Sequence, residues 1–231
     1  MISVVKRNGV VEPLNLDKLH RMVEFACDGL AGVSESAVEM NSNLQFHDGI
    51  ATSDVQEILI KSANDLITLE APNYQYVAAR LLLFSYRKSV YKGHPDNPPP
   101  LHAHIKECIG KGVYDPDLIK KYSEEEWSEL HDFIDWDRDY LFTYAGLRQV
   151  VDKYLVQDRS TGEVFETPQQ MYMLIAATLF AQYSQETRLD YVKRYYNAIS
   201  KHRINIPTPV MAGVRTPIRQ FASCVLVDID D

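Results

Sequence analysis

The segment from Ile204 to Asp231 constrains the fold more than any other part of the chain. Its first half carries prolines at positions 207, 209 and 217, and each proline lacks an amide donor and restricts the residue before it. A continuous helix from Ile204 to Pro217 is therefore excluded, and we expect this part to be extended or turned. The run from Phe221 to Ile229 is rich in β-branched and apolar residues, which predicts a short buried strand.

Polar side chains flank this predicted strand. Thr208 and Arg215 lie in the proline-rich loop, and Ser223 and Cys224 lie at the start of the strand. A polar loop that leads into a buried strand is typical of the first element of an active-site barrel, and we expect the neighbouring strands to lie outside this chain. Taken alone, however, Cys224 is best interpreted as a buried apolar thiol.

The surrounding motif favours a different interpretation of Cys224. From position 206 the chain reads Ile-Pro-Thr-Pro-Val-Met-Ala-Gly-Val-Arg-Thr-Pro-Ile-Arg-Gln-Phe-Ala-Ser-Cys-Val. This run resembles the segment that enters the ten-stranded barrel of the class I ribonucleotide reductase large subunit. The resemblance implies that Thr208 and Ser223 contact a ribonucleotide substrate. It also implies that Cys224 is redox-active, as one of two barrel cysteines that reduce the substrate and form a disulfide.

Composition limits the classes of function. A chain of 231 residues with 45% hydrophobic content suits a globular protein of one or two domains. The formal net charge of −8 argues against non-specific binding to duplex nucleic acid or to an anionic membrane, since both need clustered Lys and Arg. A nucleotide site needs only a few local cations and stays compatible with this charge.

The cysteines and the apolar runs indicate the compartment. Cys27, Cys108 and Cys224 are widely spaced and form no Cys-x-x-Cys pair, so neither a disulfide scaffold nor a zinc ribbon is predicted. The longest apolar run, residues 171–181, is shorter than the roughly 20 residues that a membrane span needs. The N-terminus also lacks a signal-peptide core. We therefore expect a cytoplasmic protein in a reducing compartment.

Residues 1–93 form the first predicted unit. Two short β-rich arms between Val4 and Glu12 flank Asn8-Gly9, which predicts a hairpin with a type I′ turn. Helical spacing of apolar residues and capping residues then predicts four helices, at about 15–29, 34–44, 52–67 and 73–91. In the third helix, Ser53 and Gln56 are spaced as a capping box. The pattern is that of a four-helix bundle with a β-hairpin lid.

The cations of this unit are ambiguous on their own, because scattered lysines usually mean a solvated surface. Their order is more informative. A hairpin Lys-Arg-x-Gly is followed by Glu12, by Asn15-Leu-Asp-Lys18, by Gly-Ile-x-Thr52-Ser-Asp, and by a Tyr-x-x-Ala-Ala-Arg helix that ends in Arg87-Lys88. This order is similar to that of the ATP-cone, the regulatory nucleotide module at the N-terminus of many ribonucleotide reductases.

The resemblance to the ATP-cone assigns roles to individual residues. It implies that ATP or dATP, with Mg2+, binds as an allosteric effector with its phosphates facing Lys6, Arg7 and Lys88. It places Glu12, Asn15 and Lys18 around the ribose and base, and Thr52 as a polar contact at the start of the third helix. The chain departs from the family at Gln56, where several members have a histidine. We therefore expect dATP to inhibit weakly or not at all.

Residues 94–203 form the second predicted unit, after a stiff proline-rich linker at 94–100. We expect helices at 101–111 and 117–122, a helix that starts at Ser123, a hairpin at 153–166, a helix at 169–182 and a last helix at 186–202. Thr167 and Pro168 form a typical start for the fifth of these elements. The resemblance to the reductase continues through Tyr-Leu-Val-x-Asp and Thr-Arg-Leu-x-Tyr-Val-Lys-Arg-Tyr-Tyr, to which we assign packing roles.

Two groups in the second unit are candidate metal ligands by residue type. His102 and His104 have no third ligand at a matching spacing, so surface or core histidines are the better interpretation. The acids from Asp132 to Asp139 alternate with aromatic residues and pair with no histidine at helical spacing, so we interpret them as a solvated helix face or loop. No metal site is predicted.

The expected fold is mainly α with some β structure. Residues 1–93 form the ATP-cone, 94–203 a helical domain, and 204–231 the start of an α/β ten-stranded barrel. The resemblance implies the N-terminal part of a large subunit that reduces ribonucleoside diphosphates by thiyl-radical chemistry. The radical cysteine and the second barrel cysteine would lie outside this chain, so we expect the chain alone to be inactive. A truncated portion and one piece of a subunit encoded in parts both fit.

The resemblance also implies partners. These are the remainder of the large subunit, a small subunit that carries the radical cofactor, and a second large subunit in a homodimer. The homodimer interface would bind a specificity effector, and Asp231 would be the first residue of that site. Two other interpretations remain. A non-catalytic nucleotide sensor, such as a cone-containing transcriptional regulator, would share only the cone and carry a zinc ribbon. A helical interaction module without a ligand is disfavoured by the motifs at both ends of the chain.

Overall fold

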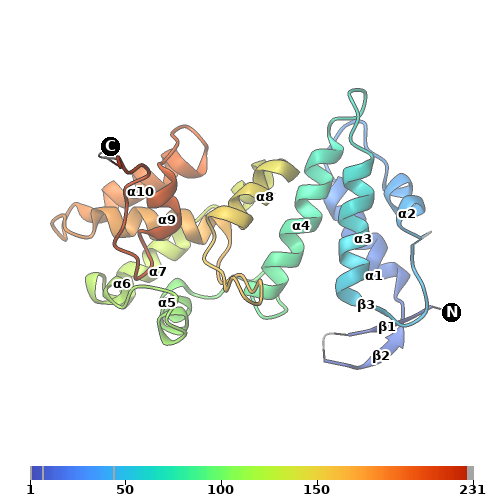
Figure 1. The fold of residues 1–231 in the computed structure, drawn as a ribbon, viewed down its shortest axis with the longest axis horizontal. Coiled ribbons are helices and arrows are strands. Elements are labelled where there is room, and N and C mark those ends of the chain that lie inside the picture. The colour runs from blue at the N-terminus through green and yellow to red at the C-terminus, as the bar shows by residue number, and fades with distance from the viewer. Residues whose placement is uncertain (1, 7, 44, 228–231) are drawn as a thin grey trace. The chain divides into compact units, whose positions relative to one another are not determined.

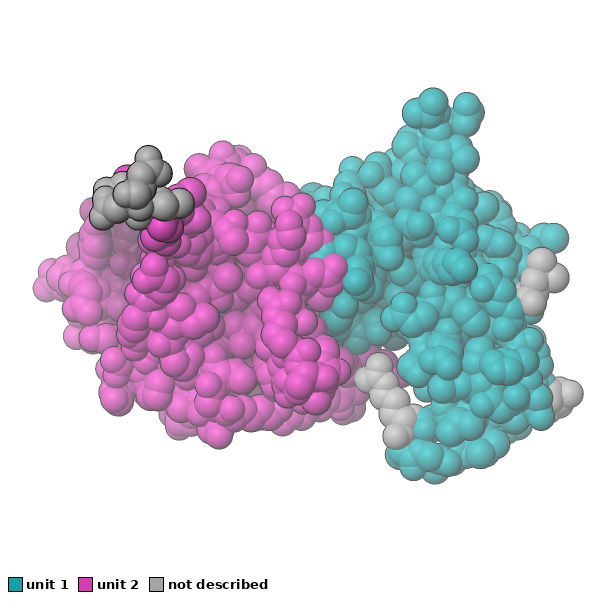
Figure 2. All heavy atoms as spheres, viewed as in Figure 1, with its two compact units in different colours: residues 1–86, 140–148 teal, residues 87–139, 149–231 magenta. Residues whose placement is uncertain are grey.

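A computed structural model describes residues 2–6, 8–43 and 45–227. The chain divides into two compact units, which Figure 2 shows in different colours. Unit 1 comprises Met1–Tyr86 and Tyr140–Arg148, and unit 2 comprises Arg87–Asp139 and Gln149–Asp231. No helix in the described ranges combines the length and hydropathy that a membrane crossing requires.

Unit 1 contains a small sheet of three strands (Figure 1). The central strand β1 (Ser3–Val5) pairs antiparallel with β2 (Val11–Pro13) and parallel with β3 (Ile50–Ala51). The carboxylate of Asp48 accepts hydrogen bonds from the N–H and hydroxyl of Ser3, at 2.8 and 2.6 Å, which ties the turn before β3 to the start of β1. The sequence did not predict β3, because two residues are too few to show a strand period.

The expected N-terminal hairpin is confirmed, but its turn differs from the prediction. The N–H of Lys6 donates to the carbonyl of Val10 at 2.9 Å, so the strands are joined by three residues rather than two. Gly9 has a φ of 80°. Gly9 therefore takes the left-handed position at the end of a longer turn.

The four expected helices of the first predicted unit are confirmed. They are α1 (Leu16–Cys27), α2 (Glu35–Asn43), α3 (Thr52–Asp65) and α4 (Tyr74–Val90). Asn15 caps α1, since its side-chain oxygen accepts from the N–H of Lys18 at 3.0 Å. Among the most deeply buried side chains of unit 1, each 2% exposed or less, are Val4, Val23, Val38, Ile50, Leu59, Ile60, Val77, Leu81 and Leu82.

The capping box predicted for the third helix is wrong. Because β3 leads straight into α3, the helix begins at Thr52 and its N-cap is Ala51, which offers no side-chain cap. Ser53 is then already inside the first turn, where its hydroxyl donates to Asp54. The Nε2 group of Gln56 donates instead to the carbonyl of Leu81 at 2.9 Å, which joins α3 to α4.

Unit 2 is helical, and its expected helices are also confirmed. They are α5 (Leu101–Gly110), α6 (Asp117–Lys121), α7 (Glu124–Phe133), α9 (Pro168–Phe180) and α10 (Arg188–Ser200). Helix α9 is buried nearly all round, as its sequence indicates, and packs against α10. The 3-10 helix η1 (Trp136–Leu141) and helix α8 (Tyr144–Lys153) were not predicted.

The second expected hairpin is reduced to a single β-bridge between Gln157 and Val164. Two hydrogen bonds support it, from the N–H of Asp158 to the carbonyl of Glu163 at 2.8 Å and from the N–H of Phe165 to the carbonyl of Val156 at 2.9 Å. The prediction of a full hairpin over 153–166 is wrong because α8 runs to Lys153 and takes up the start of the first arm.

The C-terminal segment departs most from expectation. Residues expected to be extended or turned form a short helix, α11 (Thr208–Gly213). Pro209 fits there because the first turn of a helix needs no intrahelical amide donor, and Pro217 lies beyond its end. The strand expected at 221–229 is not formed over residues 221–227, which are exposed and have no neighbouring strand in the described chain. Ile229 and the rest of 228–231 lie outside the described residues.

One acidic residue of the Asp132–Asp139 run also departs from the interpretation as a solvated surface. Asp139 is 1% exposed. Its carboxylate accepts from Nη2 of Arg87 and from Nε2 of Gln169, each at 3.0 Å. The sequence could not reveal this, because the cation partner lies 52 positions away.

Candidate functional site

The residues assigned to a nucleotide gather where the hairpin meets α1. Lys6 follows β1, and its Nζ atom lies 2.7 Å from Oε2 of Glu12 on β2. The chain then runs from Glu12 through the cap residue Asn15 to Lys18 in the first turn of α1, and these residues line an open cavity of about 510 Å³. The structure thus brings Lys6, Glu12, Asn15 and Lys18 to one place.

The sheet brings Thr52 to the same end. In the parallel ladder Val4 lies opposite Ile50 and Val5 lies opposite Ala51. Lys6 directly follows Val5, and Thr52, the first residue of α3, directly follows Ala51. Residues far apart in the sequence therefore converge at one edge of unit 1, and the convergence depends on the two-residue strand β3.

The electrostatics of this place suit an exchangeable anion. The side chains of Lys6 and Glu12 are 40% and 35% exposed, so their ion pair is worth about 0–1 kcal/mol and opens readily. The amino end of α1 carries the positive end of the helix dipole and unpaired N–H groups, which favour phosphate. The oxygen of Asn15 is engaged in the cap, so its NH2 group is the donor that remains for a ligand.

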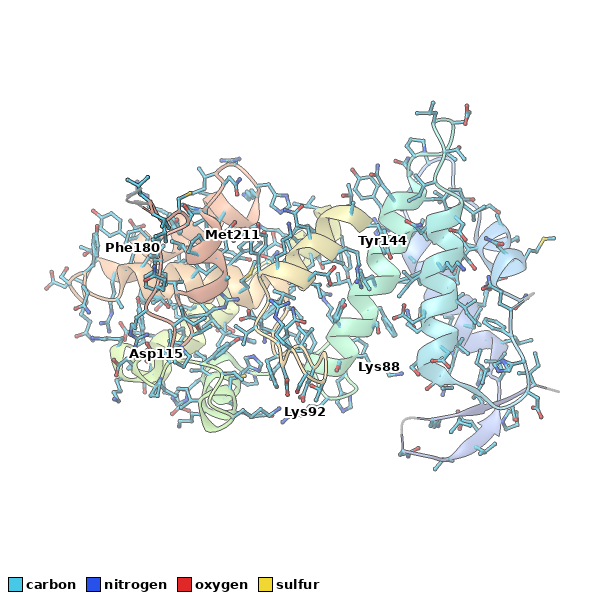
Figure 3. All side chains as sticks on the ribbon, viewed as in Figure 1. Lys88, Lys92, Asp115, Tyr144, Phe180 and Met211 are labelled. Carbon is cyan, nitrogen blue, oxygen red and sulfur yellow. The ribbon has the colours of Figure 1, made fainter. Side chains whose placement is uncertain are left out.

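Two further residues of the predicted nucleotide site are placed differently. Lys88 lies on the last turn of α4 and is exposed (Figure 3); it belongs to unit 2, whereas the hairpin belongs to unit 1. Arg7 lies outside the described residues, as does Asp231, the residue assigned to a specificity effector. The assignments of Arg7 and Asp231 therefore rest on the sequence alone.

The residues assigned to substrate lie near the C-terminus. Thr208 is the first residue of α11, and its Oγ1 lies 3.5 Å from the hydroxyl of Tyr154. Ser223 and Cys224 are exposed and contact each other, with 3.7 Å between Oγ and Sγ. In the described ranges no hydrogen bond joins Thr208 to either of them. The interpretation of Cys224 as a buried thiol does not hold for this conformation.

Comparisons with known proteins agree with both sequence motifs. Residues 2–89 match the family model of the ATP cone domain, and residues 140–219 match that of the ribonucleotide reductase all-alpha domain. The alpha subunit of the ribonucleoside-diphosphate reductase of Haemophilus influenzae is 52% identical over 230 residues. The alpha subunit of reductase 1 of Escherichia coli is 51% identical over 230 residues. That of phage T4 is 42% identical over 233 residues.

The chain thus contains an ATP cone domain and a ribonucleotide reductase all-alpha domain, and over its whole length it is similar to these alpha subunits. Each of these three alignments covers 100% of the chain and 30% of the relative. The match to residues 140–219, outside the cone, sets this chain apart from a nucleotide sensor that shares only the cone.

A buried ion pair in unit 2 was not predicted from the sequence. Glu166 and Arg215 are both fully buried and bind each other. Tyr114 joins them, since its hydroxyl donates to Oε2 of Glu166 at 2.6 Å. Burial and the negative charge of Glu166 raise the pKa of Tyr114, which keeps its phenol protonated as a donor. The one sequence signal for this pair was the position of Glu166, directly before Thr167, which caps the apolar helix α9.

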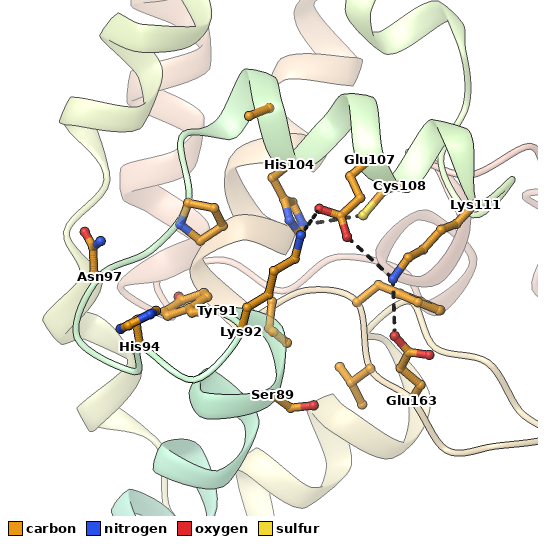
Figure 4. A pocket seen from close by; sticks show the side chains of 15 residues that line it. Ser89, Tyr91, Lys92, His94, Asn97, His104, Glu107, Cys108, Lys111 and Glu163 are labelled. Atoms are coloured by element: carbon orange, nitrogen blue, oxygen red, sulfur yellow. Dashed lines mark hydrogen bonds and ion pairs between the residues drawn. The ribbon is translucent and has the colours of Figure 1, made fainter. Parts of the chain in front are cut away.

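Unit 2 also contains a cavity of about 380 Å³ that no sequence motif marks (Figure 4). Lys92 lies 2.6 Å from Glu107, and Lys111 lies 3.3 Å from Glu163, so carboxylates already balance both ammonium groups. The ion pair with Lys92 lowers the pKa of Glu107. This balance gives the cavity no surplus charge with which to select an ionic ligand.

The buried thiols and histidines show no arrangement for metal binding. Nε2 of His104 lies 3.6 Å from Sγ of Cys108, and burial lowers the pKa of His104 and raises that of Cys108 to about 12. Burial likewise raises the pKa of Cys27 to about 11, so both thiols stay protonated. Across residues 2–6, 8–43 and 45–227, no three His, Cys, Asp or Glu side chains are grouped to hold a metal ion.

Proposed function

We propose that the chain is the N-terminal, nucleotide-regulated part of a ribonucleoside-diphosphate reductase large subunit. The observation that carries this proposal is the convergence of Lys6, Glu12, Asn15, Lys18 and Thr52 at one end of the small sheet, in a chain that matches both the cone and the all-alpha domain. We place the domain limits at 1–93 for the cone, 94–203 for the helical domain and 204–231 for the start of the barrel.

In the cone, the effector is ATP or dATP. Lys6 and Lys18, together with Arg7 and Lys88, offer positive charge to the triphosphate, and the N–H groups at the start of α1 add to it. Glu12 accepts from ribose hydroxyls, and Asn15 and Thr52 offer polar contacts to the nucleoside. Mg2+ enters with the triphosphate, because magnesium in nucleotide sites is bound largely by phosphate oxygens and water. The cone binds this effector without turning it over and acts as a sensor.

In the catalytic part, Thr208 and Ser223 bind the ribonucleoside diphosphate. Cys224 and a second cysteine of the subunit supply two electrons and two protons as they form a disulfide. The C2′–OH bond of the ribose is replaced by C2′–H, and the oxygen leaves as water. The radical that starts this reaction comes from a partner small subunit. The large subunit acts in the cytoplasm as a homodimer whose interface, starting at Asp231, binds a specificity effector.

The experiment that tests this function is deoxyribonucleotide formation by the whole large subunit with its small subunit. Cys224→Ser keeps the size of the side chain but removes the reducing thiol. We expect the variant to lose multiple turnover in the presence of dithiothreitol while still binding ATP at the cone. Normal multiple turnover by Cys224→Ser would show that this cysteine lies outside the chemistry and would overturn the assignment.

A further inference from the structure

Arg215 lies in the motif that suggested a substrate loop, but its guanidinium faces inward. The side chain is fully buried. Its Nε donates to both carboxylate oxygens of Glu166, at 3.0 and 2.9 Å, and Nη2 also donates to that carboxylate. Nη1 donates to the carbonyl of Met211 at 2.6 Å, and Nη2 donates to the carbonyl of Tyr154 at 2.8 Å. All three nitrogen atoms are bonded inside the fold, and the fully buried guanidinium is out of reach of a substrate phosphate.

Glu166 is itself fixed from several directions. Its Oε2 accepts from the hydroxyl of Tyr114 at 2.6 Å, and its Oε1 accepts from the backbone N–H of Val156 at 2.8 Å. It is fully buried and immediately precedes Thr167 and the start of α9. A carboxylate held in this way offers a rigid acceptor to the planar guanidinium, which is the geometry that favours arginine over lysine.

This ion pair determines where α11 lies. A helix of six residues is too short to persist by itself, so its position depends on tertiary anchors. Nη1 of Arg215 donates a hydrogen bond to the carbonyl of Met211, a residue of this helix that Figure 3 labels. The carbonyl of Arg215 accepts a hydrogen bond from the N–H of Asp115 at 3.0 Å. These two hydrogen bonds hold the C-terminal end of α11, one at Met211 and one at Arg215.

The same anchor reaches the first residue of α11 through Tyr154. The backbone carbonyl of Tyr154 is bound by Arg215, and the hydroxyl of the same tyrosine lies 3.5 Å from Oγ1 of Thr208. One residue therefore connects the buried ion pair to the side chain that we assign to the substrate. A shift of the guanidinium would move both the helix and the tyrosine.

We infer that Glu166 and Arg215 are positioning residues for the ribonucleotide substrate, acting through Tyr154 and α11 on Thr208. The inference rests on the proposed function, in which Thr208 contacts the substrate. It gives the buried ion pair an indirect role in substrate binding, in place of direct contact with a phosphate. Arg219, the other arginine of the motif, is a matched contrast, since its side chain is 63% exposed and pairs with Asp115 at 2.7 Å.

The test uses the whole large subunit with its small subunit and compares Arg215→Lys with Arg219→Lys. Lysine keeps the charge but lacks the planar fork, so Arg215→Lys loses the contacts to Tyr154 and Met211. We expect the KM for the ribonucleoside diphosphate to rise about tenfold, the effect of one misplaced hydrogen bond, with a smaller change in kcat. Arg219→Lys should leave KM unchanged, and ATP binding at the cone should be unchanged in both variants.

A double variant distinguishes positioning from general destabilisation. If Arg215 acts through Thr208, then Thr208→Ala and Arg215→Lys remove the same contact, and the KM of the double variant should match that of the more affected single variant. Effects that multiply would mean that Arg215 acts independently of Thr208, and they would overturn the inference. Should Arg215→Lys fail to fold, Tyr154→Phe carries the test, since it removes only the hydroxyl, and an unchanged KM there would also overturn it.

The outcomes separate the inference from the function on which it rests. An inactive wild-type subunit, or a Thr208→Ala variant with unchanged KM, would contradict the proposed function. An elevated KM in Thr208→Ala combined with an unchanged KM in Arg215→Lys would contradict the inference alone. Amide hydrogen exchange supplies a readout without catalysis, because the amides of residues 210–216 should exchange faster in Arg215→Lys while those of α10 stay protected.

Discussion

Asp139→Asn should destabilise unit 2 by an amount that the structure allows us to state. The carboxylate is almost completely buried and accepts from Arg87 and Gln169, each at 3.0 Å. Asparagine keeps the size and can still accept from Gln169, but it leaves the buried guanidinium without its counter-charge. Breaking a buried pair in this way costs about 3–5 kcal/mol. We expect the lower value, about 3 kcal/mol, because Arg87 keeps its bond to the carbonyl of Trp136 at 2.5 Å.

The two tryptophans of the chain make the assay selective. Trp127 and Trp136 both belong to unit 2, so intrinsic fluorescence during urea unfolding reports on that unit. Burial raises the pKa of Asp139, while Arg87 opposes that rise, so the measurement is made at about pH 8, far above the ordinary pKa of a carboxyl group. Asp137→Asn, an exposed acid on the same η1 helix, is the control and should change stability by less than about 0.5 kcal/mol. A loss below about 1 kcal/mol for Asp139→Asn would refute the account of a buried ion pair.

Two more predictions concern histidine and dATP. Burial lowers the pKa of His104, so between its ordinary pKa and its lowered one the unfolded chain binds more protons, and the stability of unit 2 should fall as the pH drops below about 6.5. Urea unfolding followed by tryptophan fluorescence should show a shallower fall for His104→Gln than for the exposed His94→Gln control, and identical pH profiles would contradict this. Gln56 stands where several members of the family have a histidine, so dATP should inhibit the assembled enzyme weakly or not at all. Strong inhibition at concentrations that act on histidine-containing relatives would refute that prediction.

The sequence predicted the parts of the fold that local interactions specify. The hairpin followed from Asn8-Gly9, α1 from its cap Asn15, and α9 from Thr167-Pro168 before an apolar run. Each of these signals acts within a few residues of the element that it specifies. Every predicted helix was therefore found, with its ends displaced by a residue or two, whereas α8 and α11 were not predicted.

The features that the sequence missed depend on distant partners or on neighbouring elements. Glu166 binds a guanidinium 49 positions away, and no local pattern shows that such a carboxylate is buried. The capping box failed because β3 leads directly into α3. The predicted strand at 221–229 needs a neighbouring strand to accept its hydrogen bonds, and the described chain supplies none there.

The candidate nucleotide site was predicted as a set of residues but not as an arrangement. Glu12, Asn15 and Lys18 follow one another along the chain, so their proximity is local. Lys6 joins Glu12 through the ladder between β1 and β2, and Thr52 reaches them through β3. Only the register of the sheet brings Thr52 to the hairpin, and that register is invisible in a two-residue strand.

Equilibrium binding of labelled ATP to this chain tests the central claim most directly. Lys6→Ala removes a cation at the convergence of β1, β2 and α1, and Lys61→Ala removes an exposed cation from α3 as the matched control. We expect saturable binding, no hydrolysis, and a loss of about 1–3 kcal/mol in Lys6→Ala if this lysine makes a charged hydrogen bond to phosphate, with Lys61→Ala unchanged. Equal affinity in the wild type and both variants would contradict the assignment of the nucleotide site to this end of the sheet.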